Sequence, residues 1–395
     1  MVWDVAVIGG SVTGSAMALE LAARGLRVVV LEADHFPREK PCGEGLAPSG
    51  AAWLEKHRLL GRLAAEGIHA FPAIAFHHRG RTATGAFPGG GRGVAVRRWV
   101  LDRVLAEETV RRGVERVEGA AVTGVSRQDG GWELVAGEQR WQARFVVGAD
   151  GTHGASQRLL GLRGSRSGHP RFGVRQHFRL ARPSADGLVH VHFMDGWDLY
   201  VTPLPHNELN VAALLPRSMM APLGGHLGQG FTRLLTECEP LRGLLAGATP
   251  VSTPLAWGPL ETAATGCTTD GAVLVGDAAG SADALTGQGM SVALSTAGAA
   301  ADCVARCLAD PAGAEHALRA YAAFRRRRVR DLRRLSHLLL WSVDRPWVLR
   351  LVMRALEAQP VVFTRLMAVN DGMAPLRTTV LRSAPRMVWG VAAPR

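Results

Sequence analysis

The sequence predicts an α/β fold in three parts, and the parts are marked by changes in the pattern of apolar residues. A short apolar run at residues 4–8 is followed by a glycine-rich turn and by a segment rich in Ala, Leu and Met at residues 15–24. This succession is typical of a strand–turn–helix unit of a parallel sheet. Between about residues 161 and 265, apolar runs alternate with polar turns, which indicates an antiparallel sheet. From residue 311 onward the spacing is helical.

The first turn carries Gly9, Gly10 and Gly14, with Ser11 at the place of the middle glycine of the usual dinucleotide-binding motif. Glycines there allow a tight turn and let a pyrophosphate approach the backbone closely. The helix that follows offers free N–H groups and the positive end of its dipole. The turn therefore predicts a Rossmann-like dinucleotide-binding domain.

A second apolar strand, residues 26–31, ends at Glu32. Glu32 lies 23 residues after Gly9, about where an acidic side chain accepts hydrogen bonds from the ribose of a dinucleotide.

Two further blocks follow the same logic. Residues 145–151 form an apolar strand that ends in Asp150-Gly151, and residues 272–280 form another that ends in Gly276-Asp277. In this order and at these separations, the three blocks predict one site for flavin adenine dinucleotide (FAD). We expect residues 1–160 and 266–310 to form a discontinuous FAD-binding domain, 161–265 an inserted substrate-binding sheet domain, and 311–395 a helical C-terminal region.

Composition limits the classes of function. The chain has 395 residues, 47% of them apolar, and a net charge of +12 that comes almost entirely from arginine. No nucleic-acid recognition motif accompanies the charge, so nucleic-acid binding is not predicted. Five scattered cysteines and an N-terminus that leads directly into a strand predict a cytoplasmic protein without disulfides. No apolar stretch of membrane-spanning length is expected.

An arginine run occupies residues 325–334 and is followed by Leu335, Leu338, Leu339 and Trp341 at helical spacing. One interpretation is a basic amphipathic helix in peripheral contact with anionic lipid. The other, which we favour at this stage, is a helix packed on the domain with a solvated basic face.

The blocks, taken with Arg98, Leu101, Asp102 and Leu105, resemble the flavoprotein superfamily of p-hydroxybenzoate-hydroxylase fold over residues 3–300. Within it, Pro41-Cys42-Gly43-Glu44-Gly45-Leu46 and residues 276–289 resemble the geranylgeranyl-reductase-like branch of FAD-dependent oxidoreductases. Ala284 and Gln288 stand where that branch usually has Pro and Glu.

The resemblance implies a set of cofactor contacts. Gly9, Gly10, Ser11, Gly14 and Glu32 would hold the adenosine diphosphate half. Arg98 would contact the phosphates or the ribityl chain, and Asp277 the ribityl hydroxyls. The remaining cofactor residues would be Asp150, which supports the domain, and Gly287, Gln288, Gly289 and Met290, which lie near the isoalloxazine ring.

Cys42 is the candidate catalytic residue. The resemblance places a Cys-Gly pair close to the flavin, where a thiol could protonate a carbon while the flavin delivers hydride to its neighbour. The alternative is that Cys42 only shapes the pocket, as buried cysteines commonly do. Glu44 is a second candidate acid.

The substrate side is predicted from an aromatic strand with Trp197, Tyr200 and Pro203, which the resemblance places facing the flavin. His190 and His192 share one strand face, and His177 is expected on a neighbouring strand. A metal site there would need a further ligand, and no metal is predicted.

Two enzyme functions follow. The first is an FAD-dependent reductase or dehydrogenase that acts on a carbon–carbon double bond of a hydrophobic molecule of polyprenyl, terpenoid or polyketide type. The alternative is an FAD-dependent monooxygenase that hydroxylates or epoxidises such a molecule. Flavin-dependent halogenation is disfavoured because no Trp-x-Trp-x-Ile-Pro block is present, and a flavin- or lipid-binding protein without activity is a further alternative. The reductant would be transiently bound NAD(P)H, NADPH in particular, or an acidic electron-donor protein attracted by the basic surface.

Overall fold

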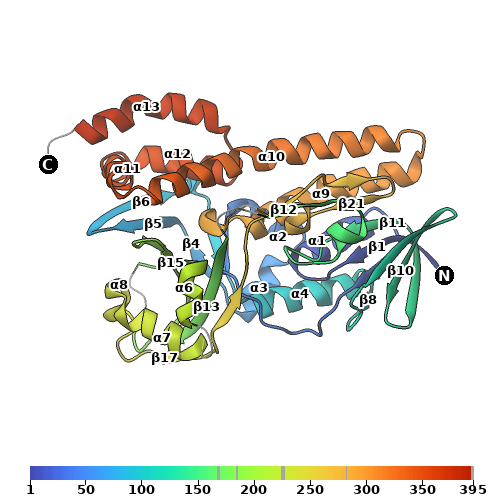
Figure 1. Cartoon of the computed structure of the whole chain (residues 1–395), viewed down its shortest axis with the longest axis horizontal. Coiled ribbons are helices and arrows are strands. Elements are labelled where there is room, and N and C mark those ends of the chain that lie inside the picture. The colour runs from blue at the N-terminus through green and yellow to red at the C-terminus, as the bar shows by residue number, and fades with distance from the viewer. Residues whose placement is uncertain (167–169, 184–185, 224–226, 282, 393–395) are drawn as a thin grey trace.

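A computed structural model describes residues 1–166, 170–183, 186–223, 227–281 and 283–392 (Figure 1). Its first sheet is largely parallel, in the order β20-β21-β11-β1-β2-β8, with the hairpin β9–β10 added to β11. The strands are β1 (Val2–Ile8), β2 (Val28–Leu31), β8 (Glu115–Val117), β9 (Gly124–Gln128), β10 (Gly131–Ala136), β11 (Gln139–Gly148), β20 (Thr268–Thr269) and β21 (Ala272–Leu274). The predicted α/β fold with a Rossmann-like sheet is confirmed.

Helices cover this sheet because its central strands are apolar on both faces. Val5 to Val7 in β1 and Val29 and Val30 in β2 have no exposed surface, as expected for strands buried between two helix layers. The covering helices include α1 (Val12–Ala22), α4 (Arg98–Arg111) and α9 (Gly289–Ala309). Alanines on α1 and α9 allow these two helices to pack closely.

The second sheet has the order β17-β13-β16-β15-β14-β5-β6, with β18 also paired to β13. All its pairs are antiparallel except β14 with β5. The strands are β5 (Ala73–His78), β6 (Arg81–Ala86), β13 (Arg171–Arg179), β14 (Val189–Phe193), β15 (Asp198–Leu204), β16 (Glu208–Pro216), β17 (Thr249–Pro250) and β18 (Leu255–Trp257).

The structure differs here from the predicted domain boundaries. Strands β5 and β6 lie within residues 1–160, yet they belong to the second sheet, because β5 pairs in parallel with β14. A hairpin of alternating residues does not reveal by itself which sheet its open edge will join.

Smaller elements complete the first 310 residues. They are β3 (Gly45–Leu46), β4 (His69–Phe71), β7 (Gly93–Ala95), β12 (Arg163–Arg166), β19 (Thr262–Ala264), α2 (Pro48–Lys56), α3 (Leu60–Glu66), α5 (Ser156–Leu159), α6 (Arg217–Met220), α7 (Leu227–Glu237), α8 (Glu239–Arg242) and the 3-10 turns η1 (Pro88–Gly90), η2 (Ala221–Leu223), η3 (Gly276–Ala279) and η4 (Ala284–Thr286).

The C-terminal region is helical, as predicted, and lies across the top of both sheets in Figure 1. It comprises α10 (Ala314–Val343), α11 (Pro346–Ala358), α12 (Pro360–Asn370) and α13 (Leu376–Ala392). Helix α12 packs on β6, where Gly85 leaves room for the Phe363 ring. A Cβ at Gly85 would lie 2.5 Å from a carbon of that ring.

One described helix, α9, is long and apolar enough to cross a membrane by length and composition, with 56% of its most apolar window buried inside the protein. The sequence reading expected no such stretch. Because α9 packs against α1, α2 and α10, we interpret it as a core helix of the protein. Burial against other helices favours the same apolar composition as burial in a membrane.

Candidate active site

A cavity of about 360 Å³ lies where the two sheets and the C-terminal helices meet. Its wall combines the N-terminus of α1, the loop before β3, the N-terminus of α9, strands β13 to β16 and one face of α10. Segments more than 300 residues apart in the chain therefore share one site.

The glycine turn forms one end of this cavity, where Ser11, Val12 and Thr13 line the wall. Gly9 has a φ of +92°, and a Cβ at Gly14 would lie only 1.7 Å from the Gly9 carbonyl oxygen. No side chain caps the first N–H groups of α1. The turn thus leaves backbone donors free at the cavity wall.

Glu32 holds the turn from behind and is not among the residues that line the cavity. Its Oε2 accepts a hydrogen bond from Gly10 N at 2.6 Å, and its Oε1 accepts one from Asp34 N at 3.0 Å. Arg116, which the sequence reading missed, donates from both terminal nitrogens to Gly10 O at 3.1 Å. The ribose contact of Glu32 stays a prediction.

Two cations face the same end of the cavity. Arg98 Nη2 donates to Ser11 Oγ and to Asp102 Oδ2, each at 2.9 Å. Lys40, one of only two lysines in the chain, also lines the wall. Burial lowers the pKa of Lys40, and the nearby Arg98 and Arg38 lower it further. The sequence reading did not assign a role to Lys40, although its position two residues before Cys42 was a usable signal.

The N-terminus of α9 forms the middle of the cavity. Asp277, Gly287, Gln288, Gly289 and Met290 all line it, as predicted for neighbours of one ligand. Gln288 begins the helix without a side-chain cap.

Asp150 does not line the cavity. Its carboxylate accepts hydrogen bonds from the backbone N of Ser156, at 2.8 Å, and from the Ser156 hydroxyl. It therefore shapes the loop behind the cavity wall, in keeping with a supporting role.

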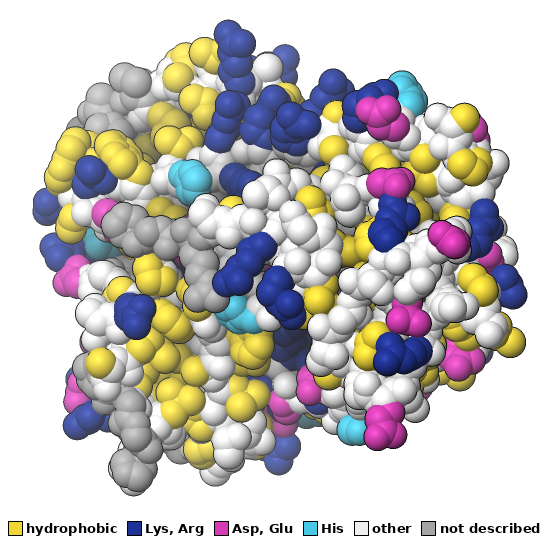
Figure 2. All heavy atoms as spheres, turned by 45° about the vertical axis from the view of Figure 1, so that its right-hand side comes forward, with side chains coloured by type: hydrophobic (Ala, Val, Ile, Leu, Met, Phe, Trp, Pro, Cys, Tyr) yellow, Lys and Arg dark blue, Asp and Glu magenta, His cyan; other side chains and the backbone are white. Residues whose placement is uncertain are grey.

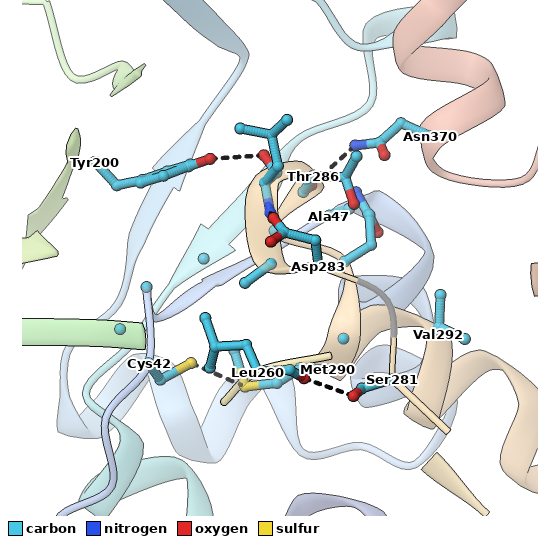
Figure 3. A pocket seen from close by; sticks show the side chains of 18 of the residues that line it. Cys42, Ala47, Tyr200, Leu260, Ser281, Asp283, Thr286, Met290, Val292 and Asn370 are labelled. Atoms are coloured by element: carbon cyan, nitrogen blue, oxygen red, sulfur yellow. Dashed lines mark hydrogen bonds between the residues drawn. The ribbon is translucent and has the colours of Figure 1, made fainter. Parts of the chain in front are cut away.

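Cys42 lies across from the α9 N-terminus, and its sulfur is 3.8 Å from the Met290 sulfur (Figure 3). The same sulfur accepts a hydrogen bond from Glu44 N at 3.3 Å. The structure thus brings Cys42 and Met290 together from segments that are far apart in the sequence.

Glu44 is fully buried and lines the cavity. Its Oε1 accepts from Arg98 N at 2.8 Å, and its Oε2 accepts from His177 Nε2 at 2.7 Å and Asn210 Nδ2 at 3.0 Å. Asn210 Nδ2 also donates to Cys42 O at 2.7 Å. Glu44 therefore links the Cys42 loop to the second sheet.

The tautomer of His177 follows from its neighbours. Arg175 Nη1 lies 3.0 Å from His177 Nδ1, and a guanidinium can only donate. Nδ1 is therefore the acceptor, and Nε2 carries the proton that is donated to Glu44.

On the substrate side, only one of the three predicted residues lines the cavity. Tyr200 does, and its hydroxyl donates to Leu285 O at 2.7 Å (Figure 3). Trp197 and Pro203 are not among the lining residues. Trp197 packs into the core on the other face of the sheet with Leu199 and Val201. Successive residues of a strand point to opposite faces of the sheet. Pro203 therefore points to the same face as Leu199 and Val201, and away from the face to which Tyr200 points.

The protein-family comparison decides the family of this chain. Residues 2–213, more than half of the chain, match the family described as FAD binding domain. The chain belongs to this FAD-binding family.

Relatives agree with the family. A menaquinone reductase of Mycobacterium tuberculosis is 31% identical over 338 residues, which cover 76% of this chain and 76% of the relative. A rifampicin monooxygenase of Streptomyces venezuelae is 32% identical over 169 residues, 40% of this chain and 34% of the relative. A flavoprotein/dehydrogenase from Cytophaga hutchinsonii has the same fold, with a TM-score of 0.83 at 18% identity over 98% of this chain and 96% of that chain. The chain is therefore an FAD-dependent oxidoreductase.

The residues present fit FAD. The α1 N-terminus, Arg98 and Lys40 offer donors and positive charge for the pyrophosphate, and a side chain at Gly14 would close the turn. Arg98 Nε and Gln288 Oε1 are buried and have no hydrogen-bond partner in the described part of the protein. Buried polar atoms are rarely left unpaired, so both are available to a polar ligand in this FAD-binding protein.

The arginine run of α10 divides between two environments. Arg325 donates to Gly276 O and Gly280 O, each at 3.1 Å, and Arg328 donates to Asp371 O at 2.9 Å. Arg333 lines the cavity. The exposed members are Arg326, Arg327, Arg330 and Arg334. Part of the run therefore supports the loop at residues 276–280, which lines the cavity in part, and neither sequence interpretation anticipated this.

The histidines group differently from the prediction. His190 and His192 stack with His77 of β5, and His77 Nε2 lies 2.9 Å from His190 Nδ1. His177 is instead buried beside Glu44. The parallel pairing of β14 with β5 causes this change. Among the described residues, no group of His, Cys, Asp or Glu is arranged to hold a metal ion.

This stack predicts acid sensitivity. Burial lowers the pKa of His192 to about 3 and of His77 to about 4, and the neighbouring histidines add to the effect. Below about pH 6.5 these two histidines bind protons in the unfolded chain, whereas they stay neutral in the folded chain. We expect the free energy of unfolding, measured in urea, to fall from pH 7 to pH 5 by on the order of 1 to 2 kcal/mol for each of these two histidines.

The matched variants locate the effect. The double variant His77→Gln/His192→Gln should show a shallower decline between pH 7 and pH 5, whereas the exposed His316→Gln should keep the wild-type decline. Equal declines in both variants would contradict the assignment.

Proposed function

We propose that this FAD-dependent oxidoreductase reduces a carbon–carbon double bond of a hydrophobic molecule of polyprenyl, terpenoid or polyketide type. The observation that carries the proposal is the apolar extension of the cavity beyond Cys42 and Met290. The C-terminal helices supply that extension through Leu332, Leu335, Leu339, Val352, Leu356, Phe363, Leu366 and Met367. These eight side chains are all apolar, and a wall with so many of them favours an apolar substrate.

Two similarities support the same class of substrate. The relative with 31% identity is a menaquinone reductase, and residues 276–289 resemble those of geranylgeranyl reductases. From these similarities we take only a hydrophobic substrate and a reductive reaction, and we apply neither name to this chain.

Saturation of a double bond takes one hydride and one proton. FAD, when bound and reduced, supplies hydride chemistry. We propose that the Cys42 thiol donates the proton to the neighbouring carbon, and that the resulting thiolate regains a proton from water. Transient NAD(P)H or an electron-donor protein would replace the two electrons.

The alternative is a monooxygenase that inserts one oxygen atom of O₂ into a hydrophobic substrate. The observation in its favour is the 32% identity with a rifampicin monooxygenase over 40% of the chain. Both reactions use an apolar, water-poor cavity, so the products must distinguish them.

The test uses flavin-loaded protein that is reduced anaerobically and divided in two. One half receives an unsaturated lipid pool without oxygen, and the other receives the same pool with oxygen. Reoxidation without oxygen, with a product heavier by two hydrogens, supports the reductase. Reoxidation only with oxygen, with a product heavier by one oxygen atom, supports the monooxygenase.

Replacement of Cys42 by alanine tests the proton donor. We expect Cys42→Ala to bind FAD normally but to lower turnover by roughly 10²- to 10⁴-fold, the usual contribution of a positioned general acid. Cys42→Ser, which keeps an O–H donor, should retain more activity. Flavin absorbance measures FAD binding, and steady-state rates measure turnover. An unchanged rate in Cys42→Ala would show that Cys42 only lines the pocket.

A further inference from the structure

The positive charge of this protein is concentrated in its C-terminal helices. Residues 311–395 contain 16 arginines and five acidic residues, so they carry +11 of the net charge of +12. The first 310 residues are almost neutral. In Figure 2, dark blue side chains gather along the upper edge of the molecule, with hydrophobic side chains between them.

Exposed apolar side chains are concentrated in the same region. Of the 13 large hydrophobic side chains that are exposed in the described part of the chain, nine lie within residues 324–381. Single exposed apolar residues are normal on protein surfaces, but a cluster of them indicates an interaction site.

The densest part of this cluster lies at the junction of α10 and α11. Here Trp341 is 49% exposed and Trp347 is 60% exposed, and the Arg345 guanidinium lies 4.8 Å from the centre of the Trp341 ring. We call this area the junction surface. It consists of Leu338, Trp341, Trp347 and Leu351 with Arg334, Arg345 and Arg350.

The residues of the junction surface share helix faces. On α10, Arg334, Leu338 and Trp341 follow one another at intervals of three or four residues, which places them in one stripe. Arg345 lies just past the end of α10, at the N-cap of α11. On α11, Trp347 and Leu351 are one turn apart. Other faces of the two helices contribute Leu335, Leu339 and Val352 to the cavity wall.

We infer that the junction surface docks on the surface of a bilayer that contains anionic phospholipids. Tryptophan concentrates at membrane interfaces, and arginines near an anionic leaflet are attracted to its negative potential. A second copy of this chain is a poor occupant, because two surfaces of the same positive sign would repel each other. The inference goes beyond the proposed reaction, and its test measures no turnover.

Cosedimentation with phospholipid vesicles tests the inference on the flavin-loaded full chain. We expect binding to phosphatidylcholine vesicles that contain a quarter phosphatidylglycerol, and at least tenfold weaker binding to pure phosphatidylcholine or at high salt. The triple variant Arg334→Gln/Arg345→Gln/Arg350→Gln should lose at least tenfold in partition to the anionic vesicles. The double variant Trp341→Ser/Trp347→Ser should lose binding to a similar degree.

A control triple variant separates the surface from the net charge. Arg27→Gln/Arg111→Gln/Arg140→Gln removes the same charge from exposed arginines outside the C-terminal helices and should bind like the wild type. Equal losses in both triple variants would overturn the inference, as would the absence of binding by the wild type. So would a stable dimer that the tryptophan variant dissociates. Retained FAD and an unchanged melting temperature show that each variant is folded.

Discussion

Replacing Gly14 with alanine is expected to abolish the retention of FAD. The new Cβ would lie 1.7 Å from the Gly9 carbonyl oxygen, which is a backbone atom and cannot rotate away. The first turn of α1 would have to shift from β1, and with it the N–H groups that face the cavity. Because we expect the pyrophosphate of FAD to bind at that turn, we expect an apparent Kd at least 100-fold weaker.

The measurement is the ratio of flavin to protein absorbance after gel filtration, followed by titration of the apoprotein with FAD. Gly61→Ala is the matched control, because Gly61 lies in a short helix with open space around its Cβ position. The control should bind FAD normally and be as stable as the wild type or slightly more so. A fully flavin-loaded Gly14→Ala protein would contradict the role of the turn.

Glu44→Ala is expected to destabilise the protein by about 3 kcal/mol or more. The substitution leaves Arg98 N and His177 Nε2 without their acceptor and removes one of the two acceptors of Asn210 Nδ2, and each unpaired buried donor costs roughly 1 to 3 kcal/mol. The backbone adds to this, because Glu44 has a φ of +61°, and its side-chain hydrogen bonds help to hold the loop in that left-handed conformation.

Urea unfolding of the apoprotein and the holoprotein measures the loss of stability. The exposed Glu55→Ala on α2 is the control and should change the free energy of unfolding by less than about 0.5 kcal/mol. A second readout is the Cys42 thiol, since Glu44 N donates to its sulfur and Asn210 ties both residues to β16. We expect faster alkylation of Cys42 in the Glu44→Ala variant. Wild-type stability and alkylation would show that Glu44 does not hold this loop.

The predictions from sequence succeeded where the signal is local. The segment 9–14, which joins β1 to the first turn of α1, has six residues, and its chemistry is visible in the positions of Gly9, Gly10 and Gly14. The same holds for the segment from Gly287 to Met290 at the start of α9, all of which lines the cavity. In each case one continuous segment contains the strand or loop, the glycine and the helix N-terminus that the fold requires.

The substrate side was harder to predict because it depends on which way each strand faces. Tyr200 points into the cavity while Trp197 packs into the core, since the strand between them alternates between two buried faces. Both faces of β15 carry apolar residues, so hydrophobicity does not distinguish them. The pairing of His77 with His190 was likewise invisible, because it depends on the parallel contact between β5 and β14.

The sequence by itself determined the α/β class, the glycine turn, the glycine-containing segment at residues 287–290 and the helical C-terminus, because glycine positions and apolar periodicity act over a few residues. Only the tertiary structure decided that Glu44 meets His177, 133 residues away, and that Arg325 and Arg333 turn inward while Arg334 stays exposed. These contacts depend on packing between distant segments. Many arrangements of distant segments are compatible with the same periodic pattern of apolar residues. The native arrangement is the one that satisfies burial and hydrogen bonding throughout the fold.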